Sequence, residues 1–418
     1  DWMFTISTGL RLRLLIFLLL HRDKQPLFMS AEARKTSFRY LIPFLFCLFS
    51  LSLAAQHDHM AESAVAEQSA PTDSENAEGH KAGFDPGHMI TEHIADAHDW
   101  HLWGHTHVPL PVIIYTSSGF ECFSSSAFRN HETHALQPYT GKYHTYILKD
   151  EQIFVAGASG EIDEALSGTI LDLSITKNVL TIFVVSLILL YVFISIARAY
   201  ARKPGQAPKG LQSFLEPIII FIRDDVAKPS IGPKYEKFMP YLLTVFFFIW
   251  FANLLGLLPV IPGGANLTGN IAITMTLALL TLIITLINGN RHYWGHIFAM
   301  PGAPIWVLLI LTPIEILGVF LRPFVLMIRL FANIAAGHII SLAFVSLVFI
   351  FGDGGNNVGA GLGVGIASWI FTVFMMALEL LVAFLQAYVF TLLSAIYFGA
   401  AVEEPHHHAA HETHTSHS

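Results

Sequence analysis

Residues 305 to 351 read IWVLLILTPIEILGVFLRPFVLMIRLFANIAAGHIISLAFVSLVFIF, a hydrophobic stretch without a polar turn. As a helix it would extend roughly 65 Å, about twice the thickness of the hydrocarbon core of a bilayer. It cannot stand upright in a membrane, so we predict a steeply tilted or bent helix. The residues at which such a helix would bend are Pro313, Gly318, Pro323 and Gly337.

Four further apolar stretches have spanning length. They cover about residues 178 to 197, 239 to 258, 269 to 288 and 366 to 399. Hydrophobic residues make up 53% of the 418-residue chain and charged residues only 13%, which is typical of a membrane protein. We therefore predict an all-α polytopic membrane protein with about five crossings.

The charge excludes nucleic acid as the main partner, because the net charge is −8 and no basic run occurs. Two cysteines, Cys47 and Cys122, cannot form a disulfide framework or a Cys-rich metal site. A Gly-rich phosphate loop of the G-x-x-x-x-G-K-[ST] type is missing from the sequence, so any ATP chemistry belongs to partners.

The positive charges predict the orientation of the spans. Segment 198 to 238 carries many Lys and Arg residues, whereas the connections 259 to 268 and 352 to 365 carry none. The first segment should be cytoplasmic and the other two outside, which leaves the C-terminus in the cytoplasm. Within the cytoplasmic segment, residues 211 to 226 show a helical apolar period that predicts an amphipathic helix in the membrane interface.

The N-terminal region shows the order of a secretory signal. Met29 is followed by basic residues, an apolar run and a small-residue end at Ala54 and Ala55. We expect residues 1 to 28 to be upstream read-through, 29 to 55 a cleaved signal peptide, and the N-terminal arm to lie outside. The alternative is a retained anchor, for which the apolar run is short.

Three further segments complete the predicted organisation. Residues 56 to 107 form a His-rich exported arm, 108 to 171 a small exported subdomain with short strands, and 403 to 418 a His-rich cytoplasmic tail. The membrane domain covers 172 to 402. The two His tracts could bind zinc or copper, but they have no ligand spacing such as HExxH, so solvated histidine is the favoured interpretation and no metal or cofactor is expected.

Ionisable residues concentrate in the last two hydrophobic stretches. Each costs a few kcal/mol at depth in a membrane, so each is a functional hypothesis. Arg suits a fixed positive charge on an ion path, whereas His and Glu can gain and lose protons. The alternative is that Arg329 pairs with Glu379, or Arg322 with Glu315, in static ion pairs between helices. The candidates are Glu315, Arg322, Arg329, Asn333 and His338 in the long stretch and Glu379 and Gln386 in the last span.

Three strings carry a family resemblance: PIEILGVFLRPFVLMIRLFANIAAGH (313 to 338), LLVAFLQAYVFTLL (380 to 393) and FANLLGLLP (251 to 259). They resemble the a subunit of F-type ATP synthase over about residues 172 to 400. The resemblance implies that the long stretch and the last span form a tilted helix pair beside a rotor ring of c subunits. Asn253 and Asn270, in and near the third string, are secondary candidates.

The resemblance also implies roles for individual residues. Arg329 would be the essential stator arginine, and Asn333, Gln386, Glu315 and Arg322 match polar positions of the family. Some family members have an acid where this chain has His338 and a His where it has Glu379. This exchange suggests that the two residues meet across the helices as one relay.

The implied function is that of a stator subunit in a bacterial inner membrane. Its partners would be the c-ring, b subunits, the rest of the synthase and the lipid bilayer. Two half-channels would load and unload the c-ring carboxylates, and Arg329 would separate them. A secondary transporter with an intramembrane charge pair is the alternative, but we find no internal repeat of the kind typical of such folds. The choice between proton and sodium coupling remains open.

Overall fold

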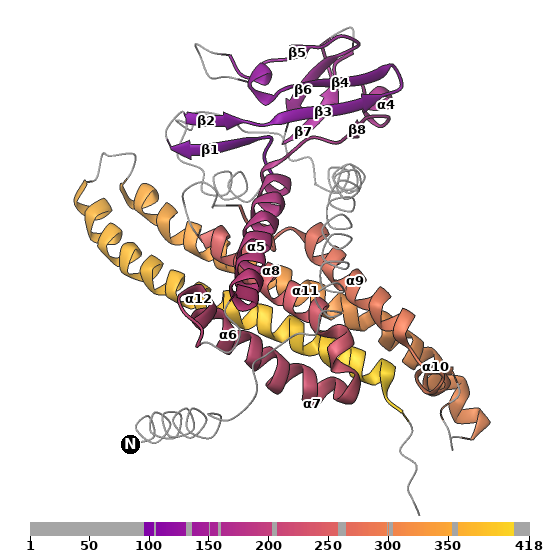
Figure 1. Cartoon of the computed structure of the whole chain (residues 1–418). Coiled ribbons are helices and arrows are strands. Elements are labelled where there is room, and N and C mark those ends of the chain that lie inside the picture. The colour runs from indigo at the N-terminus through magenta and orange to yellow at the C-terminus, as the bar shows by residue number, and fades with distance from the viewer. Residues whose placement is uncertain are drawn as a thin grey trace, which may run out of the picture.

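The computed structural model describes residues 96–103, 106–130, 136–149, 151–157, 160–202, 207–257, 265–298, 300, 304–352 and 358–404. The predicted read-through segment, the signal peptide, most of the His-rich arm and nearly all of the tail lie outside the described residues. The described part contains a β-rich unit followed by long helices (Figure 1). This confirms the prediction of a helical polytopic protein with a β-containing N-terminal extension.

The β-rich unit contains short antiparallel strands in three small sheets, with strand orders β1-β2, β4-β3-β8 and β5-β6-β7. Its strands are β1 (Asp99–Trp103), β2 (Thr106–Pro109), β3 (Pro111–Thr116), β4 (Gly119–Ser124), β5 (Tyr139–Thr140), β6 (Thr145–Lys149), β7 (Gln152–Val155) and β8 (Leu171–Asp172). Two short helices, η1 (Ser125–Phe128) and α4 (Glu164–Ser167), connect them. The β-structure therefore begins inside the segment expected to be a weakly structured arm.

Alternation along β3 explains the core of this unit. Val112 and Ile114 point inward and are fully buried, whereas Tyr115 between Ile114 and Thr116 is exposed. Tyr146 is also buried, and its hydroxyl donates to the carboxylate of Glu121 at 3.1 Å. The Glu121 carboxylate also accepts the backbone N–H groups of Lys142 and Tyr143, so a buried charge is satisfied where two sheets meet.

The helical part contains five helices long and apolar enough to cross a membrane, among the residues that the structure describes. The helices are α5 (Lys177–Arg202), α6 (Leu211–Phe221), the π-helix η2 (Ile222–Ala227), α7 (Lys228–Ile231), the 3-10 helix η3 (Gly232–Lys234), α8 (Tyr235–Leu257), α9 (Ile271–Asn288), α10 (Arg291–Phe298), α11 (Ile305–Gly352) and α12 (Val358–Val402). The run from α6 to α8 counts as one of the five candidates.

The segment predicted as an interfacial amphipathic helix is helical from Leu211 onward. Its predicted apolar face is only partly covered: Leu215, Ile222 and Val226 are buried, whereas Leu211 and Phe214 are exposed. The buried members belong to the core that also contains α8 and α12. This segment therefore packs on the helical core along its later turns.

The long hydrophobic stretch forms one uninterrupted helix, α11, of 48 residues. The helix continues through all four positions at which we expected it to bend, including Pro313 and Pro323. Helix α12, of 45 residues, returns beside it. The two form a long antiparallel pair that runs obliquely past α5 and α8 (Figure 1), as the prediction of a slanted pair requires.

Aromatic side chains form the core on which this pair rests. Phe246, Phe247 and Phe248 of α8 are fully buried, and the ring of Phe238 stacks on Phe398 of α12 with centroids 4.8 Å apart. The outward sides of α11 and α12 remain apolar and exposed, for example Leu309 at 79%. Such surfaces suit lipid or a membrane partner.

Residues 96 to 98 join the β-rich unit to α5. The side chain of Asp96 accepts from the hydroxyl of Thr176 and the N–H of Asn178, both at 3.0 Å. The ring of His98 is buried, with Nε2 3.3 Å from Asp172 Oδ2, and its backbone N–H donates to Glu151 at 3.0 Å. This polar cluster fixes the start of α5 to β8 and to the turn before β7.

The charge on His98 makes this junction sensitive to pH. Burial alone lowers the pKa of His98, but hydrogen bonds and charges from Asp172 and Glu151 outweigh it and raise the pKa to about 9. Burial also opposes ionisation of the two carboxyl groups, yet their bonds to His98 hold the pKa values of Glu151 and Asp172 below the usual range.

We expect the amide protons of β3 and β8 to be best protected from exchange between about pH 5 and pH 6.5 in the intact protein in vesicles. Protection should fall as the pH rises through about 9, because His98 then loses a proton that folding favours, and again below about pH 4 as the carboxylates protonate. Hydrogen exchange measured by mass spectrometry checks this. The variant His98→Gln should lack the alkaline loss, and an unchanged alkaline loss in that variant would contradict the assignment.

Candidate functional site

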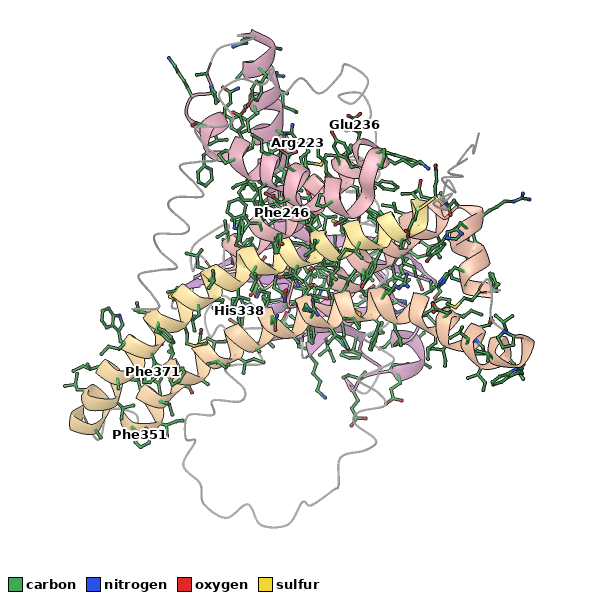
Figure 2. The ribbon with its side chains drawn as sticks, turned by 90° about the horizontal axis from the view of Figure 1, so that it is seen from below. Arg223, Glu236, Phe246, His338, Phe351 and Phe371 are labelled. Atoms are coloured by element: carbon green, nitrogen blue, oxygen red, sulfur yellow. The ribbon has the colours of Figure 1, made fainter. Side chains whose placement is uncertain are left out.

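The structure brings together His338 of α11 and Glu379 of α12. His338 Nε2 lies 3.5 Å from Glu379 Oε1, and only 7% of the Glu379 side chain is exposed. This distance permits an ion pair, but Glu379 Oε1 makes no hydrogen bond and is buried. The expected meeting of these two residues across the helices is confirmed. Figure 2 shows His338 near the middle of the long pair, away from the end marked by Phe351 and Phe371.

A glycine makes this approach possible. A Cβ atom at Gly337 would lie 3.0 Å from Glu379 Oε1, so a side chain at that position would push the carboxylate away. On the α8 side, a Cβ atom at Gly256 would lie 3.8 Å from His338 Nε2. The His338–Glu379 pair therefore lies between three helices, α8, α11 and α12, each of which approaches closely.

Asn253 of α8 supports the wall beside this pair. It is buried, its amide donates weakly to the carbonyl of Ala383 at 3.5 Å, and its Oδ1 accepts from the hydroxyl of Thr268. Asn270, by contrast, caps the N-terminus of α9, where its Oδ1 accepts from Ala272 N at 2.9 Å. Asn253 thus belongs to the site geometry, and Asn270 has a visible structural role.

The backbone of Arg329 on α11 is held by a hydrogen bond from α12. The buried amide of Gln386 donates from Nε2 to the backbone carbonyl of Arg329 at 2.8 Å. The side chains of Arg329 and Asn333 are exposed, in contrast to the buried Glu379 and the half-buried His338. Along α11 the arginine lies nine residues, about 13 Å, from His338.

The proposed static ion pairs do not form among the described residues. Arg329 is not paired with Glu379, and Arg322 is not paired with Glu315. The guanidinium carbon of Arg322 instead lies 5.7 Å from the ring centroid of Tyr397. Neither of the two ion pairs that the sequence left open is therefore present in the described part of α11 and α12.

A second polar region surrounds Arg322 near α10. A small cavity of about 10 Å³, about the smallest that can hold one water molecule, opens between α9, α10, α11 and α12. Its lining includes Thr285, Tyr293, Arg322 and Tyr397, and the buried hydroxyl of Tyr293 has no hydrogen-bond partner. Sequence reasoning missed Tyr293 because a lone Tyr in a short polar helix carries no motif.

The candidate residues therefore form three groups along α11. His338 and its neighbour Glu379 come last along the helix, and Arg329, Asn333 and Gln386 lie in the middle. Arg322 lies beside the small cavity, with Glu315 two turns before it. Metal ligation is not supported by the described residues, since no three His, Cys, Asp or Glu side chains gather at ligand distance there. The arrangement suits proton transfer at one level and a fixed exposed charge at another.

Comparisons with known proteins show which family this chain resembles. The family model for the ATP synthase A chain matches residues 179–399, and one described as Domain of unknown function (DUF8433) matches residues 89–173. The chain is 48% identical over 248 residues to ATP synthase subunit a 2 of Chlorobaculum tepidum, covering 58% of this chain and 67% of that protein.

Two other relatives come from different genera. ATP synthase subunit a 2 of Prosthecochloris aestuarii is 42% identical over 59% of this chain and 73% of its own length. ATP synthase subunit a of Myxococcus xanthus is 39% identical over 60% of this chain and 80% of its own length. The family match begins in the first turn of α5 and ends within the last turn of α12, so it includes all three groups of site residues. With more than half of its length matched by that family model, the chain belongs to the ATP synthase A chain family, whose members include the proteins named ATP synthase subunit a.

Proposed function

We propose that this chain forms the two proton half-channels of an ATP synthase stator and faces a ring of c subunits. The observation that carries the proposal is the arrangement on α11: a half-buried His338 beside the buried Glu379, and an exposed Arg329 whose backbone is held by Gln386. The pair supplies groups that exchange protons inside the protein. The arginine supplies a permanent charge at its surface.

The proposed path follows from these positions. A proton entering from the exported side reaches Glu379 and His338, passes to a c-subunit carboxylate, travels with the ring and leaves on the cytoplasmic side. Arg329 lies between the two access points and favours the ionised form of the carboxylate facing it, which prevents a direct hop. The cavity beside Arg322 and Tyr293 is the natural position for the cytoplasmic access point.

The partners and orientation belong to the same proposal. The c-ring covers the exposed face of α11 and α12 around Arg329, b subunits and the remaining synthase complete the complex, and the membrane is the bacterial inner membrane. The β-rich unit is exported and the C-terminus is cytoplasmic. Figure 1 agrees with this polarity, since the β-rich unit lies on one side of the helices and α10 on the other. A secondary transporter is less well supported, because the described spans show no matched pair of broken helices.

The replacement Arg329→Ala tests the stator role. ATP-driven proton pumping by inverted vesicles should fall to background, because nothing then separates the two access points. Arg329→Lys should retain only a small part of the activity, since an ammonium can lose its proton in a poor dielectric. The measurement is dye quenching together with co-isolation of c, b and soluble subunits. Normal pumping by an assembled Arg329→Ala complex would refute the proposal.

An exchange variant tests the relay pair. Separately, His338→Glu and Glu379→His each place two like groups in one site, and we expect pumping to fall by roughly tenfold or more. The double variant restores one acid and one imidazole at the observed 3.5 Å contact and should recover a substantial part of the rate. Additive losses in the double variant would show that the two residues act independently.

A further inference from the structure

The antiparallel ribbon formed by β1 and β2 places two histidines opposite each other. In its register Trp100 pairs with Val108, and His101 pairs with His107. Residues directly opposite each other in an antiparallel pair share one face, with Cβ atoms about 4.5–5.5 Å apart. His107 follows His101 by six residues, a spacing that matches no ligand motif in the sequence. The strand pairing is therefore what shows that the two positions are neighbours.

The two faces of this ribbon differ in their surroundings. Trp100, which precedes His101, is only 5% exposed, so its face of the ribbon packs inward at that point. Successive residues of a strand alternate between faces, which places the His101 and His107 positions on the opposite face. Asp99 shares that face, but its carboxylate accepts from Nε of Arg129 at 2.9 Å and pairs with the guanidinium. The two histidine positions therefore decide what this face can bind.

The ribbon forms a small sheet of its own. Among the strands that the structure describes, β1 and β2 pair only with each other. A two-stranded ribbon is at best marginally stable in water, so a link between its strands would add stability. Strand β1 begins one residue after His98, and the ribbon thus extends from the junction that fixes the start of α5.

We propose that the β1–β2 ribbon binds a divalent transition-metal ion at the register position of His101 and His107. Imidazole is a common ligand of Zn²⁺ and Cu²⁺, and a metal–nitrogen distance of about 2.0–2.1 Å suits two histidines at cross-strand distance. Ca²⁺ and Mg²⁺ prefer a shell of oxygen ligands, so they do not fit this pair. Water completes the coordination, and the ion links the two strands.

This site lies outside the part of the chain that matches the ATP synthase A chain. That family model covers residues 179–399, whereas the ribbon falls within the second match, at residues 89–173. Metal binding here therefore goes beyond the proposed function, and neither proposal depends on the other. It also replaces the sequence-based expectation of solvated histidine, because the register supplies the neighbouring ligand that the linear spacing lacks.

Hydrogen exchange measured by mass spectrometry on the intact, detergent-purified complex tests the site. Zn²⁺ at about ten times its half-saturating concentration should slow exchange of the β1 and β2 amide protons about tenfold relative to EDTA, because the ion stabilises the paired strands. Strands β6 and β7 are the internal control and should not change. Mg²⁺ at the same concentration should have no effect.

Three ribbon variants locate the ion. His101→Gln and His107→Gln should each abolish the zinc effect on β1 and β2. The double variant His107→Val with Val108→His keeps the composition but moves one histidine to the other face, so it should also abolish the effect. The matched control His406→Gln with His408→Gln removes two histidines of the C-terminal tail and should keep it. Zinc and EDTA are compared within each variant, which separates the zinc effect from any change in the stability of the ribbon itself.

The outcomes are distinct from those that test the proposed function. A zinc effect that is present in the wild type and the tail variant and lost in all three ribbon variants supports the metal site. No slowing in the wild type, or slowing that persists in the ribbon variants, overturns it, because the two histidines would then be solvated. Pumping by Arg329→Ala decides the proposed function separately, whatever zinc does to the ribbon.

Discussion

The packing of α11 against α12 along most of their length is the constraint on which the rest of the structure depends. A helix of 48 residues exceeds the thickness of a bilayer, so it must run obliquely. An oblique helix exposes much of its surface, and its polar residues need a partner that follows the same course. Helix α12 provides this partner, and through it the buried Glu379 and Gln386 reach α11 at two separate levels.

Several features of this pair could be predicted from the sequence. The uninterrupted apolar stretch predicted one long helix, and the exchange of acid and imidazole relative to family members predicted the contact between His338 and Glu379. Both could be predicted because the first depends on one continuous sequence range and the second on a single pair of positions. The four positions proposed as bends do not interrupt the helix, since α11 continues through Pro313 and Pro323. At Pro323, which is buried and lies near residues of α9 and α12, packing supports the helix where the proline removes one backbone bond.

Other features could not be predicted because they depend on contacts between distant segments. The hydroxyl of Thr268 bonds to Asn253, and the cavity beside Arg322 is lined by Tyr293 and Tyr397 from two other helices. The pairing of β1 with β2 lies in a stretch whose composition indicated an arm. Its strands are stabilised by the β-rich unit, and the buried His98 ties that unit to α5 through carboxylates more than 50 residues away.

The hydrogen bond from Gln386 reaches the backbone carbonyl of Arg329 and leaves the guanidinium out of the contact. The backbone of Arg329 is therefore fixed, while its long side chain keeps its rotamer freedom. The charge therefore stays at one level along the helix. Its side chain can still change rotamer to reach partner groups that lie at slightly different positions. Gln386 fixes the position of the Arg329 backbone, and the Arg329 side chain provides the reach. Small shifts of a partner group can therefore be followed without moving the helix.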